Sequence, residues 1–405
     1  MKSPAVLPLA DPTAMGFSPS RLASLDAMLT REVTSGQMPG AVVGIARGGH
    51  LIHLKAFGYR DPDTRAPMAT DSLFWIASMT KPITTVGTLA LHEQGRLLLD
   101  DPLPSFLPEF ADQEVAELNP ASGLVRQVPA LRPPTIQDLL RHTSGIVEGL
   151  LGDTPVHKMY ADAVSDGMTD YTGQQFIERL SRVPLLHQPG TLWHYGWGLD
   201  LVGLIIEKIT RGSLRKHLHD SVFAPLGMHD TTFGVPEDQR HRFAHPYSHD
   251  PMTGRPQGLP DLSQAEFDSG GAGLVSTAVD YLRFAQMLLD HGRLGSTQVL
   301  GRKTVEYMTS DQLDAGTSRE NLADMTARLE GYTFGLGLAI RRQNGLAPTA
   351  GSVGDMTWPG AAGTYWWVDP REDLAVVFLT HTPSRAARVR YYQLIRAAVL
   401  QAFVD

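Results

Sequence analysis

Hydrophobic patterning near the start of the chain predicts a helix followed by a β-hairpin. Ser18 can cap a helix whose first turn contains Pro19. Apolar residues then recur on one helical face at Leu22, Leu25, Leu29 and Val33. Two strand-like runs follow, at 42–47 and 51–57, and the glycine pair 48–49 separates them. This arrangement is typical of two antiparallel strands joined by a tight turn.

The middle of the chain is expected to be mostly helical. The spacings Thr135-x-x-Asp138 and Thr277-x-x-Asp280 have the form of capping boxes, each at the start of a helix. Helices are expected at 136–142, 174–183, 199–210, 213–224 and 278–291. Two segments rich in Pro, Gly and polar residues are expected to form long surface loops, at 112–134 and 235–270.

Strand character returns near the end of the chain. Strands are expected at Tyr332 to Ile340, Thr364 to Val368 and Leu374 to Thr380, with Asp369-Pro370 turning between the last two and an amphipathic helix at 385–403. Strands at both ends with helices between them predict an α+β fold, an α/β sandwich whose mainly antiparallel sheet is flanked by helices. The sheet domain would comprise 1–75 plus 292–405, with a mostly helical domain inserted at 76–291 and the active site between them.

Composition and charge narrow the function classes. The 405 residues are 42% hydrophobic and 19% charged, with a net charge of −8, a pI near 6.0 and no run of five like charges. This balance argues against nucleic acid or an anionic membrane as a partner. The chain has no cysteine, which excludes disulfides, thiolate metal sites and cysteine nucleophiles. The apolar stretch at 5–10 is too short for a secretory signal and no run approaches 18 apolar residues, so a cytoplasmic protein is expected.

The first candidate for chemistry is the pair Ser78 and Lys81, just ahead of the apolar run 83–91. Residues three apart share one face of a helix, so the hydroxyl and the amine can meet. Serine is a weak nucleophile near neutral pH, and a desolvated neutral lysine could serve as its base. Most Ser-x-x-Lys sequences are nevertheless solvated helix faces, so the motif needs support from other residues.

The tryptophans are distributed unevenly. All six fall in three short segments, at Trp75, at Trp193 and Trp197, and at Trp358, Trp366 and Trp367. The first segment contains the Ser78 motif and the second brackets Tyr195. An aromatic-lined substrate cleft would produce this grouping. Ordinary use of tryptophan in a core would produce it as well.

Two further features could belong to an active site. A phenol near a lysine ammonium has a lowered pKa, so Tyr195 could carry a proton during acyl transfer, although a buried core tyrosine is the commoner case. The run Gly360-Ala361-Ala362-Gly363 permits a close backbone approach, as an oxyanion hole requires. A simple tight turn would use the same residues.

Together the three segments resemble the serine β-lactamase and penicillin-binding-protein superfamily, whose elements are Ser-x-x-Lys, Tyr-x-Asn and Lys-Thr-Gly. The chain more closely resembles the class C β-lactamase-like carboxylesterases called family VIII, where Trp-x-Gly commonly replaces Lys-Thr-Gly, as at Trp358-Pro359-Gly360. Other stretches similar to that family are 139–145, 270–277 and 334–337, so the resemblance spans about residues 17 to 400 in the family's order.

The resemblance implies a β-lactamase/transpeptidase-like fold and a role for each motif residue. Ser78 would be the nucleophile, Lys81 its activating partner and Tyr195 the general base or proton shuttle. The oxyanion hole would be formed by the backbone N–H groups of Ser78 and Ala361. Lys81 and Tyr195 titrate as a coupled pair, so the sequence leaves open which of them takes the proton first.

Two departures from the superfamily pattern point away from β-lactams. Trp197 replaces the asparagine of Tyr-x-Asn, and Trp358 replaces the lysine that would attract a carboxylate. With Trp75 and Gly360, these residues are expected to contact substrate. The expected substrates are small-molecule esters with uncharged, bulky or aromatic parts. No metal and no cofactor is expected, and the oligomeric state is not indicated.

Three other motifs are weaker candidates. The segment 350–354 imitates the Gly-x-Ser-x-Gly elbow around Ser352 but lacks its first glycine. Ser144 is expected to lie in a turn that ends a helix. His241, His245 and His249 recur every four residues, but the proline between them argues for loop histidines over a metal site.

Three functions therefore remain open. The first is a serine ester hydrolase. The second is amide or transfer chemistry at the same site, as in a β-lactamase, a D-amino peptidase, an amidase or an acyltransferase. The third is a non-catalytic ligand-binding protein of the same fold, which would need none of Ser78, Lys81 and Tyr195.

Overall fold

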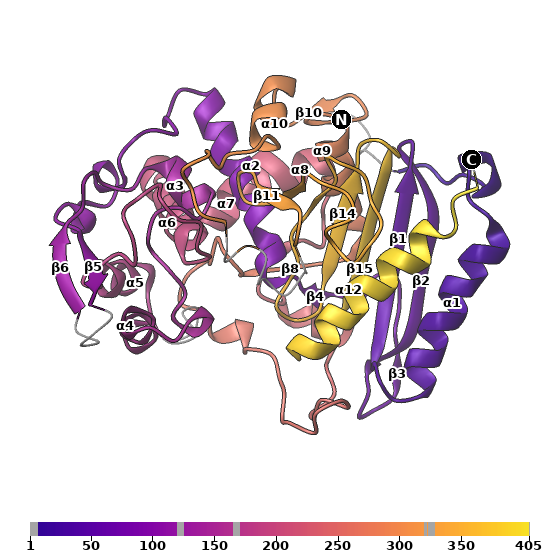
Figure 1. Cartoon of the computed structure of the whole chain (residues 1–405). Helices are drawn as coiled ribbons and strands as arrows, with labels where there is room; N and C mark the ends of the chain where they lie inside the picture. Colours follow the sequence, from indigo (N-terminus) through magenta and orange to yellow (C-terminus); the bar gives the residue numbers. More distant parts are fainter. Residues whose placement is uncertain (1–6, 120–124, 165–170, 320–321, 323–328, 405) are drawn as a thin grey trace.

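The computed structural model describes residues 7–119, 125–164, 171–319, 322 and 329–404. An antiparallel eight-stranded sheet, in the order β11-β12-β13-β14-β15-β1-β2-β3, joins strands from both ends of the chain. In Figure 1 these early and late segments lie side by side on the right. The strands are β1 (Gly40–Arg47), β2 (His50–Asp61), β3 (Ala66–Pro67), β11 (Tyr332–Phe334), β12 (Ala339–Arg341), β13 (Met356–Thr357), β14 (Tyr365–Asp369) and β15 (Leu374–Thr380).

Alternation along the central strands produces two separate cores. On β14 the side chain of Trp366 packs in a core shared with the helical part of the chain, and the next side chain, Trp367, packs in a core on the opposite face. Val377 and Val376 of β15 divide in the same way. Successive residues of a strand point to opposite faces, so a sheet covered on both faces is apolar at every position.

Helices cover both faces of the sheet. α1 (Pro19–Thr34) and α12 (Arg385–Leu400) pack together on one face, and α9 (Ala278–Leu289) packs on β15 and β1 from the other. The remaining helices lie on the left and in the centre of Figure 1. Those on the left are α3 (Ile136–Leu140), α4 (Pro155–Ala163), α5 (Gly173–Leu180), α6 (Gly198–Thr210) and α7 (Leu214–Leu218), and those in the centre are α2 (Thr80–Glu93), α8 (Ala224–Leu226) and α10 (Arg302–Met308). Three small sheets complete the fold. One has three strands in the order β4 (Phe74–Trp75), β8 (Leu274–Ser276) and β7 (Thr232–Phe233). The other two are the pairs β5 (Glu114–Leu118) with β6 (Val125–Pro129) and β9 (Arg293–Leu294) with β10 (Thr297–Gln298).

The predicted fold class is confirmed, and most of the local signals are too. Ser18 caps α1, and Thr135 and Asp138 form a complete capping box at α3. Thr277 caps α9, but Asp280 does not complete the box, since its carboxylate accepts from Asp230 N and the Thr231 hydroxyl instead. The domain boundaries at 75/76 and 291/292 stay a prediction.

Three predicted elements were wrong in detail. The single strand expected at 332–340 is a hairpin, β11 and β12, because Gly337 takes a φ of +73° and reverses the chain. The loop expected at 112–134 contains the antiparallel pair β5 and β6. The apolar residues of β6, Val125 and Val128, are three positions apart and lack the alternation typical of a half-buried strand. The helix expected at 213–224 is α7 followed by one π-helical turn at 219–223.

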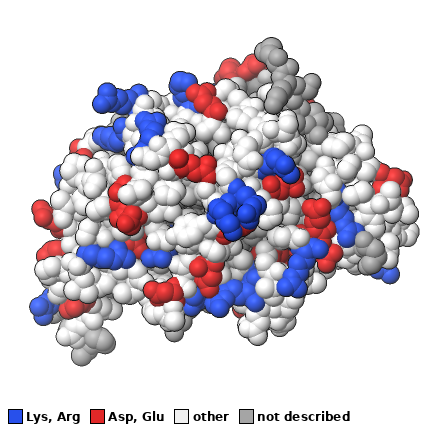
Figure 2. All heavy atoms as spheres, turned by 90° about the horizontal axis from the view of Figure 1, so that it is seen from above, with Lys and Arg blue, Asp and Glu red and all other residues white. Residues whose placement is uncertain are grey.

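Charged side chains are spread evenly over the face of the molecule that Figure 2 shows. Figure 2 shows basic and acidic side chains interspersed among uncharged ones over the face seen from above. Within the described ranges, no helix combines the length and apolarity needed to cross a bilayer. Residues 1–6, where the N-terminal stretch discussed above begins, lie outside the described residues.

Candidate active site

Ser78 lies in a 3-10 turn, Ala77–Met79, between β4 and α2. The preceding residue, Ala77, has a φ of +46°, a left-handed conformation that costs an L-residue about 1–2 kcal/mol. The Tyr281 hydroxyl donates to Met79 O at 2.9 Å, and Leu274 N donates to Thr80 Oγ1 at 3.2 Å. These buried contacts hold the turn in place and present the Ser78 side chain to a cavity.

The three residues of the predicted catalytic set meet at this turn. The Tyr195 hydroxyl donates to Ser78 Oγ at 2.7 Å. Lys81 Nζ lies 4.6 Å from the centroid of the Tyr195 ring and donates to Gly271 O at 2.8 Å. Lys81 is 4% exposed, because α2 is buried from Thr80 to Leu91. The Tyr195 phenol therefore contacts the Ser78 hydroxyl directly, and the Lys81 amine lies beside the phenol ring.

Charges around Lys81 favour its protonated form. Burial alone would lower its pKa, but the interactions with Tyr195, Asp200 and Glu148 outweigh burial, and the pKa of Lys81 is raised. Burial raises the pKa of Asp200, against the opposing effects of Lys81 and of a hydrogen bond from Ser269. This environment favours the ammonium over the neutral lysine that the sequence alone allows.

His142 supports Tyr195 from the turn that follows α3. Its carbonyl accepts from His194 N at 2.9 Å, and its Nδ1 accepts from Gly196 N at 3.3 Å, so it holds the backbone on both sides of Tyr195. Its ring lies 4.6 Å from the Tyr195 ring. Burial, reinforced by the charge of Lys81, holds the pKa of His142 well below its ordinary value, so the imidazole is neutral and can accept.

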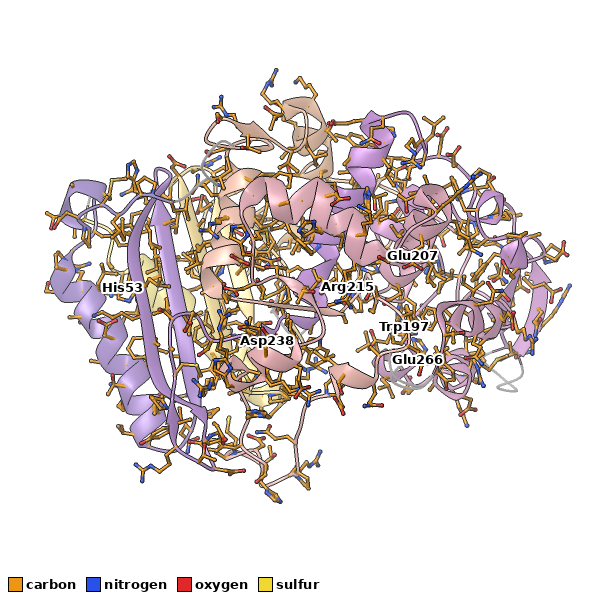
Figure 3. The ribbon with its side chains drawn as sticks, turned by 180° about the vertical axis from the view of Figure 1, so that it is seen from behind. His53, Trp197, Glu207, Arg215, Asp238 and Glu266 are labelled. Carbon is orange, nitrogen blue, oxygen red and sulfur yellow. The ribbon has the colours of Figure 1, made fainter. Side chains whose placement is uncertain are left out.

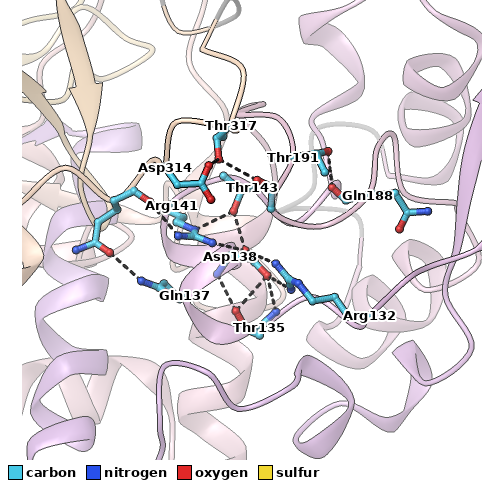
Figure 4. A network of polar contacts seen from close by, with 12 residues as sticks. Arg132, Thr135, Gln137, Asp138, Arg141, Thr143, Gln188, Thr191, Asp314 and Thr317 are labelled. Atoms are coloured by element: carbon cyan, nitrogen blue, oxygen red, sulfur yellow. Dashed lines mark hydrogen bonds and ion pairs between the residues drawn. The ribbon is translucent and has the colours of Figure 1, made fainter.

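A buried polar network fixes the segment that carries His142. Figure 4 shows the Asp138 carboxylate surrounded by Arg132, Arg141, Thr135 and Thr143. The Asp138 side chain is fully buried, and these donors compensate for its desolvation. The network thus sets the position of the turn beneath Tyr195.

The turn at 360–363 brings Ala361 to the same cavity. Gly360 N donates to Thr364 O and Gly363 N donates to Gly360 O, and the Ala361 N–H takes part in neither bond. A Cβ on Gly360 would lie 2.4 Å from Ile76 O, so only glycine lets this turn pack against the chain just before Ser78. Ser78 and Ala361 consequently line one cavity, as an oxyanion hole formed by their backbone N–H groups would require.

The cavity at Ser78 has a volume of about 470 Å³. This lies in the range usual for small-molecule sites. Its described lining is Trp75, Ala77, Ser78, Lys81, Glu148, Leu150, Gly196, Trp197, Asp200, Gly258, Leu259, Pro260, Ala272 and Ala361. Figure 3, seen from behind, places Trp197 among the helices on the right.

The tryptophans divide between the cleft and the core. Trp75 and Trp197 line the cavity, whereas the expected substrate contacts Trp358 and Gly360 are absent from its described lining. Trp358 is 1% exposed and packs behind Tyr195, with ring centroids 5.4 Å apart. Its apolar ring supports the phenol from the core side, so the sequence argument for direct substrate contact does not hold there.

The residues of the three weaker motifs make local contacts of their own. Ser144 Oγ accepts from Ile146 N within a turn, and the backbone N–H of Ser352 donates to Asp369. His241 Nδ1 lies 3.0 Å from Asp238 O, a contact within its own turn. In the described part of the chain, no group of three or more His, Asp or Glu side chains could hold a metal ion.

Sequence reasoning missed three residues of the site. His142 and Gly271 lie inside segments noted only for their family resemblance, and Asp200 lies in the first turn of α6, which is otherwise apolar to Ile206. A carboxylate within an apolar helical run was the one signal that could have singled out Asp200, because unpaired buried charges are costly.

Comparisons with known proteins agree on one family. Residues 25–400 match the family described as Beta-lactamase. Protein Rv1367c of Mycobacterium tuberculosis is 35% identical over 362 residues, covering 87% of this chain and 88% of its own. Esterase EstB of Burkholderia gladioli is 31% identical over 399 residues, covering 92% and 93%. The solved structure of EstCE1, described as a hydrolase with promiscuous acyltransferase activity, has a TM-score of 0.75 at 26% identity and covers 92% of this chain and 98% of its own.

Proposed function

This chain belongs to the beta-lactamase family, and we propose that it is a serine carboxylesterase that hydrolyses small-molecule esters through an acyl-enzyme on Ser78. The resemblance to family VIII carboxylesterases is confirmed by the likeness to EstB and EstCE1. Esterase and acyltransferase relatives support an enzyme of hydrolase or acyl-transfer type. The serine mechanism and the substrate preference are the proposal.

One observation carries the proposal: the 2.7 Å hydrogen bond between the Tyr195 hydroxyl and Ser78 Oγ, beside the buried Lys81. A serine hydroxyl needs a partner within hydrogen-bond reach that can take its proton, and Tyr195 is that partner. A binding protein would need neither this contact nor a lysine buried beside it.

The reaction would proceed in two halves. With the pair in its Lys81-ammonium, Tyr195-phenolate form, the phenolate takes the Ser78 proton as Oγ attacks the ester carbonyl carbon. The N–H groups of Ser78 and Ala361 stabilise the oxyanion, and Tyr195 returns the proton to the departing alcohol as the C–O bond breaks. Water then attacks the acyl-enzyme, giving its proton to Tyr195, which passes it to Ser78 Oγ as the acid leaves.

The cavity favours esters with apolar or aromatic parts. Trp75, Trp197 and Leu259 line it, and Lys81 is the one Lys or Arg side chain in its described lining. Since Lys81 is buried against Tyr195, the described lining offers no free cation to bind a β-lactam carboxylate. We therefore expect at most weak β-lactamase activity.

Acyl transfer is the second candidate function. It is favoured by the description of EstCE1 as a hydrolase with acyltransferase activity. An alcohol acceptor that reaches the acyl-enzyme in place of water would yield a new ester by the same proton transfers. Adding a simple alcohol and measuring ester product against free acid decides between the two outcomes.

The proposal is tested with short and medium p-nitrophenyl esters and a cephalosporin, comparing the wild type with Ser78→Ala. The wild type should hydrolyse the esters and turn over the cephalosporin at least about a hundredfold less efficiently, by analogy with the size of discrimination from missing polar contacts. Full esterase activity in Ser78→Ala would rule out the nucleophile. Equal turnover of the β-lactam and the best ester would rule out the substrate preference.

A further inference from the structure

Asp200 is a buried carboxylate beside the catalytic residues that the reaction above does not use. It is 2% exposed and lies in the first turn of α6, where the residues around it are apolar. A carboxylate withdrawn from water destabilises the fold unless its surroundings compensate, and an apolar residue at this position would avoid that cost.

The contacts of Asp200 lead to Lys81 through a single residue. The Ser269 hydroxyl and the Gly271 N–H, at 3.2 Å, both donate to Asp200 Oδ1. The carbonyl of the same Gly271 accepts from Lys81 Nζ at 2.8 Å. A Cβ on Gly271 would lie 2.2 Å from Asp200 Oδ2, so only glycine allows the two to pack this closely.

The charges near Lys81 come from several segments of the chain. The groups that bear on it are Tyr195, Asp200 and Glu148, while the neutral His142 lies nearby. Tyr195 must lose its proton in order to act, and the backbone N–H of Glu148 donates to Tyr195 O at 3.3 Å. Asp200 is the carboxylate that is joined to Lys81 through hydrogen bonds to one shared residue.

We propose that Asp200 is a positioning residue for Lys81: through its hydrogen bond from Gly271 it fixes the carbonyl that accepts from the ammonium, and its carboxylate balances the charge of that ammonium. The protonated lysine in turn favours the phenolate of Tyr195, which receives the Ser78 proton. Asp200 also lines the cavity, but in this scheme it contacts none of the reacting atoms and acts through Lys81. This inference rests on the proposed esterase function.

The test compares Asp200→Asn with Thr84→Val, using a p-nitrophenyl ester across a range of pH. Asp200→Asn keeps the shape of the side chain and removes its charge. Thr84→Val removes the hydrogen bond from Thr84 Oγ1 to Gly270 O, at 2.7 Å, and loosens the same loop without changing charge. Circular dichroism and thermal melting would establish that each variant is folded.

For Asp200→Asn, kcat should fall about 10²-fold or more while KM stays within about threefold. Loss of the negative charge also lowers the pKa of Lys81, so the alkaline limb of the pH profile should move toward acid. Thr84→Val should leave the profile in place. A fall in kcat without a shift of the profile would reduce Asp200 to a structural role and overturn the proposal.

Ser269→Ala covers the case in which Asp200→Asn does not fold. It keeps the carboxylate but removes a donor that favours the ionised form, so a smaller acid shift with about a tenfold loss of kcat is expected. An unchanged profile would overturn the proposal. If the wild type hydrolyses no ester at all, the proposed function itself fails. If the wild type is active and Asp200→Asn matches it, only this inference fails.

Discussion

Acid should destabilise the fold through His381, a buried histidine at the end of β15. It is 1% exposed, with its ring between Phe74 and Phe243 and its Nδ1 2.9 Å from Ala244 O. Burial lowers the pKa of His381 to about 4 from the ordinary 6.5, although hydrogen bonds to the carbonyls of Ala244 and Trp75 act in the opposite direction. In the unfolded chain the imidazole regains its ordinary pKa.

The sign and size of the effect follow from that difference. A folded pKa below the unfolded value means that the unfolded chain binds the extra proton, so stability is complete above pH 6.5 and is lost as pH falls toward 4. A difference of about 2.5 pKa units corresponds to about 3 kcal/mol of unfolding free energy. That is a large share of the net stability of a typical domain.

The assay is urea unfolding of the wild type and His381→Gln, from about pH 7.5 down to about pH 4. Glutamine cannot be protonated, and the other histidines contribute equally to both proteins, so they cancel in the difference. His381→Gln should be the less stable protein near neutrality, and the gap should shrink by about 3 kcal/mol at the acid end. A gap that stays constant across the range would refute the burial argument.

Three further predictions concern the site. Tyr195→Phe should keep the fold and lower kcat by about 10²–10⁴, measured with a p-nitrophenyl ester; near-wild-type turnover would contradict its role as proton carrier. His142→Asn, which keeps an acceptor and tolerates a positive φ, should retain more activity than His142→Ala, by about tenfold in kcat. Equal losses would mean that the acceptor for Gly196 does not matter. Gly271→Ala should lower both kcat and the melting temperature, because the added Cβ would clash with the Asp200 carboxylate. A variant with unchanged kcat and melting temperature would show that the loop relaxes without cost.

Local patterns in the sequence were enough for much of the fold. The Gly48-Gly49 hairpin, the cap at Ser18 and the strand β15 depend on neighbouring residues alone, and each is where the pattern predicts it. The short spacing between Ser78 and Lys81 likewise brings both residues to one cavity. These features need no knowledge of distant contacts.

Contacts between distant segments determine the features of the site that the sequence alone does not predict. Asp200 and Gly271 lie seventy-one positions apart, and nothing local marks them as partners. The sequence does not distinguish Trp358 from Trp197. Trp358 packs behind Tyr195 whereas Trp197 lines the cavity, because strand register and helix packing decide which way each ring faces. Position relative to the sheet, and not residue type, separates core from cleft.

Labelling with a fluorophosphonate followed by peptide mapping tests the central claim most directly. The probe reacts with an activated serine, and the candidates in this chain are Ser78, Ser144 and Ser352. We expect one adduct, on the peptide that contains Ser78, with labelling lost in Ser78→Ala and strongly slowed in Tyr195→Phe. An adduct on Ser144 or Ser352, or undiminished labelling of Ser78→Ala, would contradict it.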